Sequence, residues 1–198
     1  MPSHPVAVNE NAARSDRVRA LAERARVGSA AAFADLYEEF FPRLRQFLDA
    51  RLRHSLIDPE DVAQETFAKA WNAIERYDST HRFSTWLYTI ALRTATDHQR
   101  KHTVAREHRQ GVAVNEAQAP SGSVDTTDEA DNLWSLAKQV LTKDQYAALW
   151  LRFGEDLSIK EVATTLGRST MSIRVLLFRA RGRVRDKAAA QERQKVVL

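Results

Sequence analysis

The chain has 198 residues, of which 43% are hydrophobic, and its formal net charge is +4 at pH 7; this length fits one domain or two small ones. Cysteine is absent, which excludes disulfides and thiolate metal sites, and no apolar run approaches the ~18 to 20 residues of a membrane span, so we expect no membrane insertion. The N-terminus lacks the charged start and apolar stretch of a signal peptide, and we expect a cytoplasmic protein.

The first part of the chain predicts two helices after a short polar start. Residues 1–14 contain proline and few large apolar side chains, and we expect them to be mobile. A helix is predicted over 17–27, with Gly28 as its C-terminal cap. Ser29 caps a second helix, which Pro42 bends or divides. Its apolar stripe comprises Phe33, Leu36, Tyr37, Phe40, Leu44, Phe47 and Leu48.

A third helix is predicted from Asp58, which serves as cap before Pro59, to about Arg76. One of its faces is apolar and consists of Ala63, Phe67, Ala70, Trp71 and Ile74. Another face is a small polar patch with two carboxylates: Asp61, Gln64, Glu65 and Ala68. Lys69 is the one base in 61–71 and is expected off the patch, whereas an ordinary solvated face intersperses lysine and glutamate. Read alone, this pattern also fits core tryptophan beside ordinary surface carboxylates.

A turn-rich loop at 77–82 leads to a fourth helix, which begins at Ser84 or Thr85 and reaches about His102. Periodicity then fails over 103–131, where glycine, proline and serine gather and no base occurs between Arg109 and Lys138. A structureless stretch of this length is unusual inside one domain, so it indicates a flexible acidic linker between domains.

The second half predicts four helices. A short amphipathic helix covers 133–141, and two capping boxes, Thr142 with Gln145 and Ser158 with Glu161, start the next two. The residues expected to point inward from the first of these two helices are Tyr146, Leu149, Trp150 and Phe153. The other helix ends at Gly167, and Ser169 caps a long helix with a core face of Ile173, Leu177, Ala180 and Val184.

The fold prediction is therefore all-α, with two small helical domains and no strand. The first domain spans 15–102, the linker 103–131, the second domain 132–187 and a basic C-terminal tail 188–198. A short helix, a turn at Gly167 and a longer basic helix form a helix-turn-helix pattern, which fits DNA binding. A solvated basic helix at the end of a bundle is the alternative interpretation.

Two groups of segments resemble the sigma factors of bacterial RNA polymerase. The run 61–71 followed by 83–91 resembles the polymerase-docking and promoter-melting helices of sigma region two. Residues 157–163, 166–167, 173–174 and 179–181 resemble sigma region four. The extracytoplasmic-function group of the sigma-70 family fits best, because its members consist of these two regions and a linker.

The resemblance implies core RNA polymerase and promoter DNA as partners. Region two would dock on the beta-prime clamp helices through Asp61, Gln64, Glu65 and Ala68, and region four would dock on the beta flap. An anti-sigma factor is a third candidate partner under the same resemblance. Contacts to the downstream promoter element are expected from Asp78, Ser79, Thr80, His81, Arg82, Phe83, Trp86, Arg93, His98, Arg100 and Lys101. Contacts to the upstream element are expected from Arg168, Ser169, Thr170, Met171, Ser172, Arg174, Arg179 and Arg181.

The upstream-reading helix departs from the family pattern. The family usually has small or polar residues at its start and a serine and a base after the position of Arg174, where this chain has Met171 and Val175–Leu176. Fewer hydrogen-bonding groups are thus available for base readout. Met171 and Val175 either touch thymine methyls, pack on a partner or mark a weakened contact.

Two other functions are alternatives to this interpretation. The first is a metal-dependent nuclease or recombinase, with Asp61 and Glu65 as a pair of metal-binding acids. The pattern argues against it, because the two acids share their patch with Gln64 and lack a third acid at helical spacing. No sequence motif predicts catalysis, a cofactor or a metal, and His98 with His102 lacks a third ligand. A stand-alone helix-turn-helix regulator is the main alternative; it would bind its site without polymerase.

Overall fold

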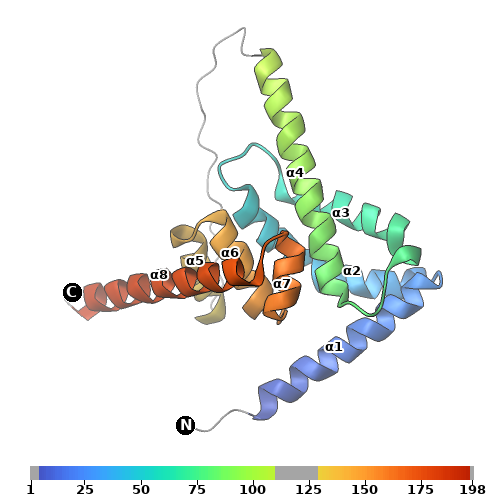
Figure 1. Cartoon of the computed structure of the whole chain (residues 1–198), viewed down its shortest axis with the longest axis horizontal. Helices are drawn as coiled ribbons and strands as arrows, with labels where there is room; N and C mark the ends of the chain where they lie inside the picture. The colour runs from blue at the N-terminus through green and yellow to red at the C-terminus, as the bar shows by residue number, and fades with distance from the viewer. Residues whose placement is uncertain (1–4, 110–128, 197–198) are drawn as a thin grey trace. The chain divides into compact units, whose positions relative to one another are not determined.

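The computed structural model describes residues 5–109 and 129–196, and within these ranges the chain is helical without a strand (Figure 1). This confirms the all-α prediction. The chain divides into two compact units, of which the first contains the residues up to Asp49 and Ile57–Val104, and the second contains Ala50–Leu56 and the residues from Ala105 onward. No helix of the described ranges is both long and apolar enough to cross a bilayer.

The first unit is built around α2. Its helices are α1 (Pro5–Arg26), α2 (Ala30–Leu52) as far as Asp49, α3 (Pro59–Ala73) with a 3-10 turn η1 (Ile74–Arg76), and α4 (Phe83–Arg109) as far as Val104. Aromatic side chains of α2 meet those of α4: the rings of Phe40 and Phe83 lie 5.4 Å apart, and those of Phe47 and Tyr88 lie 5.0 Å apart. These four side chains are almost fully buried, so Phe40 and Phe47 of the predicted α2 stripe lie in the core of the unit.

The second unit packs three short helices against one long one. They are α5 (Glu129–Val140), α6 (Lys143–Leu149) with a π-helical turn η2 (Trp150–Gly154), α7 (Ile159–Leu166) and α8 (Thr170–Val196). Ile173, Leu177 and Ala180 of α8 are buried, as the sequence predicts. The helix continues beyond the other helices of its unit to its C-terminal end (Figure 1).

The structure corrects four predicted element boundaries. Residues 5–14 belong to α1, because Pro5 fits a first helical turn and several alanines follow. Pro42 does not divide α2, which is a single helix. Helix α4 runs to Arg109, seven residues into the predicted linker, and 110–128 lie outside the described residues. The basic tail is helical to Val196 as the continuation of α8.

Candidate functional site

The polar patch of α3 faces solvent, on the side away from the core. Asp58 caps the helix, and its carboxylate accepts a hydrogen bond from the backbone N–H of Glu60 at 2.8 Å. Asp61, Gln64 and Ala68 are exposed. The opposite face is buried through Val62, Ala63, Thr66, Phe67 and Ala70. The prediction that Asp61, Gln64 and Ala68 share an exposed face is therefore confirmed.

Glu65 is the member of the patch that has partners. Its carboxylate lies 2.8 Å from Lys69 Nζ and 2.5 Å from His98 Nε2, with 35% of the side chain exposed. Hydrogen bonds from Lys69 and then His98 lower the pKa of Glu65 to about 2. The expectation that Lys69 lies off the patch was wrong, because lysine four residues after a glutamate reaches its carboxylate across one helical turn.

His98, which we expect to contact DNA, is partly exposed and lies against Glu65 in the structure. It belongs to α4, and its contact joins this helix to α3. Lys69 makes a second link, because its ammonium donates to Thr94 Oγ1 at 3.2 Å. The proposed polymerase patch and the helix expected to face the promoter therefore share one polar network.

The loop that precedes α4 is held in one conformation by local hydrogen bonds. Tyr77 is buried, which raises the pKa of its phenol to about 12, and its hydroxyl donates to the carbonyl of His81 at 2.6 Å. Asp78 accepts from the backbone N–H of Thr80 at 2.9 Å. Ser79 donates to the carboxylate of Glu23 in α1 and lowers the pKa of that group. The donors and acceptors of this loop are thus prearranged on the surface.

An aromatic cluster lies next to this loop. Trp86 is partly buried, with its ring 5.3 Å from that of Tyr77 and 5.7 Å from that of Phe83. Phe83 is 2% exposed, so the prediction that it contacts DNA was wrong: its ring fills the core beside Phe40. The partly exposed Trp86 is the aromatic side chain of this cluster that an unstacked base can reach.

The basic side chains predicted to meet the downstream element lie on the surface. Arg82, at the end of the loop, is exposed, and so are Arg93, Arg100 and Lys101 along α4. His81 and Thr80 are exposed on the loop as well. The first unit therefore exposes guanidinium and ammonium groups along α4 and next to the loop 77–82.

The helix-turn-helix of the second unit has the predicted turn. The hydroxyl of Ser158 caps α7 in a capping box with Glu161. Gly167 ends α7 in a left-handed conformation with φ of 61°, which a residue with a Cβ adopts only with strain. The hydroxyl of Ser169 accepts from the backbone N–H of Ser172 and so caps α8. Local sequence signals alone thus define this turn.

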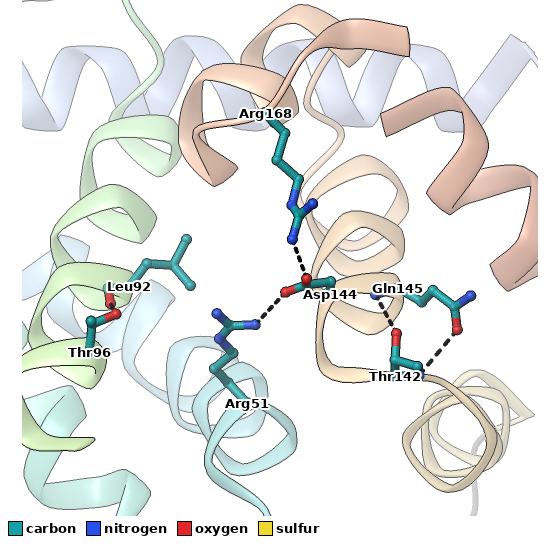
Figure 2. A network of polar contacts seen from close by, with 7 residues as sticks. All are labelled: Arg51, Leu92, Thr96, Thr142, Asp144, Gln145 and Arg168. Atoms are coloured by element: carbon teal, nitrogen blue, oxygen red, sulfur yellow. Dashed lines mark hydrogen bonds and ion pairs between the residues drawn. The ribbon is translucent and has the colours of Figure 1, made fainter. Parts of the chain in front are cut away.

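Asp144 ties the start of α6 to two arginines of the second unit (Figure 2). Its carboxylate lies 2.7 Å from Arg51 Nη1 and also pairs with Arg168. The neighbouring capping box of Thr142 and Gln145 is also formed. Arg168, which we predicted to contact the upstream element, has an acidic partner within its own unit, so it is held near the turn.

The remaining residues predicted to read the upstream element lie at the start of α8. Thr170, Met171, Arg174 and Arg179 are exposed, and Ser172 is partly exposed. The guanidinium of Arg181 lies 5.9 Å from the ring centre of Phe153.

Phe153 itself is 52% exposed, so its predicted inward position was wrong. It lies in the π-helical turn η2, where one extra residue per turn rotates the side chain out of the expected face.

Sequence reasoning missed two residues that position the surfaces. Glu23 reaches Ser79 from α1, and nothing in the local sequence indicates a contact over that separation. Asp144 lies between Thr142 and Gln145 of the predicted capping box, and its ion pairs with Arg51 and Arg168 were not predicted. Among the described residues no group of three or more histidine, aspartate and glutamate side chains is arranged to hold a metal ion.

Each of the two units matches a known protein family. The sigma-70 region 2 family matches residues 36–104, and the sigma-70 region 4 family matches residues 134–184. The RNA polymerase sigma-H factor of Pseudomonas aeruginosa is 31% identical over 85% of this chain and 91% of its own. The RNA polymerase sigma factor CarQ of Myxococcus xanthus is 33% identical over 83% of this chain and 93% of its own.

The fold also matches a solved structure. It is the sigma factor RpoE in complex with the anti-sigma factor NepR from Bartonella quintana, with a TM-score of 0.60 and 22% identity. The match covers 78% of this chain and 94% of that one.

Proposed function

We propose which surfaces of this chain, which belongs to the extracytoplasmic-function group of the sigma-70 family of RNA polymerase sigma factors, bind polymerase and which bind the promoter. As a sigma factor it directs core polymerase to promoters. In our assignment α3 docks on core polymerase, the loop 77–82 with α4 meets the downstream promoter element, and the start of α8 reads the upstream element.

The docking assignment rests on the exposed and largely unpaired polar side chains of the α3 patch. Asp61 and Gln64 are exposed and have no hydrogen-bond or ion-pair partner among the described residues, while Glu65 beside them is oriented by Lys69 and His98. Carboxylates in this state are available to cations of a partner. Charged pairs across an interface add specificity and, when desolvated, affinity. This supports α3 as the surface that binds the beta-prime clamp helices.

The downstream assignment rests on the loop and its aromatic neighbour. Separating promoter strands without ATP requires that bases are captured as they unstack, which needs a platform and base-edge partners. Trp86 supplies a partly exposed aromatic ring, and the loop from Asp78 to His81 supplies donors and acceptors in a fixed arrangement. Arg93, Arg100 and Lys101 are placed to contact phosphates.

A charge-reversal experiment tests the docking assignment. The double variant Asp61→Lys with Glu65→Lys should lose at least tenfold in affinity for core polymerase in a co-purification or fluorescence titration, with unchanged helicity by circular dichroism. The variant Asp35→Lys with Glu38→Lys, which makes the same change of charge at two exposed positions on α2, is the matched control and should bind like wild type. Equal binding of the double variant and the control would refute the assignment of the α3 patch.

A further inference from the structure

The outward face of α8 carries an exposed apolar stripe. Met171 is 63% exposed, Val175 40% and Phe178 80%. At 3.6 residues per turn these three side chains fall within about 60° of one another on the helix. The buried Ile173, Leu177 and Ala180 lie on roughly the opposite side, so core packing does not use the stripe.

Positive charges flank this stripe. Arg174 and Arg179 are exposed and project on either side of it, at about 60° and 80° from Met171. Neither has a hydrogen-bond or ion-pair partner within the described residues, in contrast to Arg168, which pairs with Asp144. An apolar strip between two unpaired guanidinium groups has the charge distribution of a surface that fits between phosphate backbones.

The position of the stripe in the helix-turn-helix specifies which part of DNA it meets. The second helix of this motif lies in the major groove, and the residues of its N-terminal part reach the base edges. Met171 and Val175 lie in the first two turns of α8, after the turn fixed by Gly167. The apolar group that the bases expose in the major groove is the C5-methyl of thymine.

We propose that Met171 and Val175 read thymine methyl groups in the upstream promoter element, so that this chain recognises part of that element by apolar contact rather than by hydrogen bonds. The proposal rests on the proposed role of α8 as the upstream reader. Neither side chain donates a hydrogen bond, so at the bases they face, thymine is distinguished from cytosine by its methyl group. Arg174 and Arg179 hold the helix in the groove through phosphates and adjacent base edges.

The test removes only the methyl groups from DNA. The holoenzyme first selects bound duplexes from a randomised library, which yields the upstream element. Each thymine of that element is then replaced by 2′-deoxyuridine, and binding of the holoenzyme is measured by titration. One buried methyl contributes about 0.8 kcal/mol, so replacement at a contacted thymine should weaken binding roughly fourfold. Placing cytosine there should weaken binding further, and 5-methylcytosine should recover part of the loss.

Variants link the methyl effect to the two side chains. Val175→Ala and Met171→Ala should each weaken binding to thymine-containing DNA and abolish the difference between thymine and deoxyuridine at one position. Leu133→Ala, which shortens an exposed side chain on α5 of the same unit, is the matched control and should keep the full difference. Deoxyuridine outside the upstream element should have no effect.

The outcomes separate this proposal from the proposed function. If the holoenzyme selects no shared upstream element, the role of α8 as its reader fails. If it selects one but deoxyuridine is tolerated at every thymine, the methyl readout is overturned while the reader role stands. If the alanine variants weaken binding but leave the deoxyuridine effect unchanged, the stripe contacts a protein, and the methyl readout is again overturned.

Discussion

His98 Nε2 lies 2.5 Å from Glu65 Oε2, so that one residue of α4 contacts a carboxylate of the docking patch on α3. Lys69 adds a second partner to the same carboxylate and a hydrogen bond to Thr94 on α4. A carboxylate that is already held by two partners loses less conformational entropy on binding than a mobile one, which favours binding. The two helices that we assign to polymerase and to DNA are thereby linked through Glu65.

Replacing His98 tests whether this link orients the docking carboxylate. His98→Ala should reduce affinity for core polymerase by about two- to fivefold, since partly exposed ion pairs contribute up to ~1 kcal/mol. His102→Ala is the matched control, because His102 is exposed on the same helix. Affinity is measured by fluorescence titration with labelled core enzyme. Equal effects of both variants would show that His98 does not position Glu65.

The acid sensitivity of the first unit should depend partly on Glu65. Its pKa is lowered from 4.5 to about 2 in the folded chain, so its stabilising contribution is present above about pH 4.5 and is lost as pH falls towards 2. Because the side chain is 35% exposed, solvent screening limits that contribution to about 1 kcal/mol or less. The stability difference between wild type and Glu65→Gln, measured by denaturation between pH 2 and 6, should shrink over this interval. A difference that stays constant with pH would contradict the shifted pKa.

Two glycines of the second unit should respond oppositely to alanine. Gly167→Ala should destabilise the unit by about 1 kcal/mol or more, because alanine is strained at the φ of 61° found there. No atom lies within 4 Å of an added Cβ, so this cost comes from the backbone and not from a steric clash. Gly182→Ala lies in the interior of α8, also with open space around an added Cβ, and should stabilise by up to ~1 kcal/mol. Urea denaturation of both variants measures these changes. Loss of stability in both would mean that backbone conformation does not explain the role of Gly167.

The loop before α4 should matter for strand opening more than for binding to duplex DNA. Asp78→Ala removes the acceptor of the Thr80 N–H and loosens the loop that we assign to base capture. We expect slower and less complete open-complex formation, measured by the fluorescence of 2-aminopurine in the downstream element, with nearly unchanged binding to closed duplex. Glu60→Ala removes an exposed acid at the start of α3 and serves as the control. Equal losses in opening and in duplex binding would argue against base capture.

Local signals in the sequence predict the helices well, because caps and apolar spacing act within a few residues. Asp58, Thr142 and Ser158 start helices where their side chains indicate, and Gly167 ends one. The paired state of Glu65 could be predicted only in part. Lys69, four residues away, was the available signal, whereas His98 approaches from another helix and depends on tertiary packing.

Two errors at the candidate surfaces have the same kind of cause. Phe83 was assigned to DNA because it adjoins the loop, but the ring fills a space opposite Phe40, which only the packed unit defines. Phe153 was assigned to the core on the assumption of a regular helix, and the π-helical turn changes its direction. In each case the decisive information is the three-dimensional arrangement rather than the local pattern.

The most direct test of the account is transcription with the reconstituted holoenzyme. Core polymerase is mixed with this protein on fragmented DNA from the source genome, and the 5′ ends of the transcripts are sequenced. A sigma factor with the proposed surfaces should give a limited set of start sites that depend on the protein and share upstream and downstream elements, and the Asp61→Lys, Glu65→Lys variant should lose these starts. Start sites identical with and without the protein would contradict this prediction, as would specific binding to the same DNA by the protein alone with no effect on initiation.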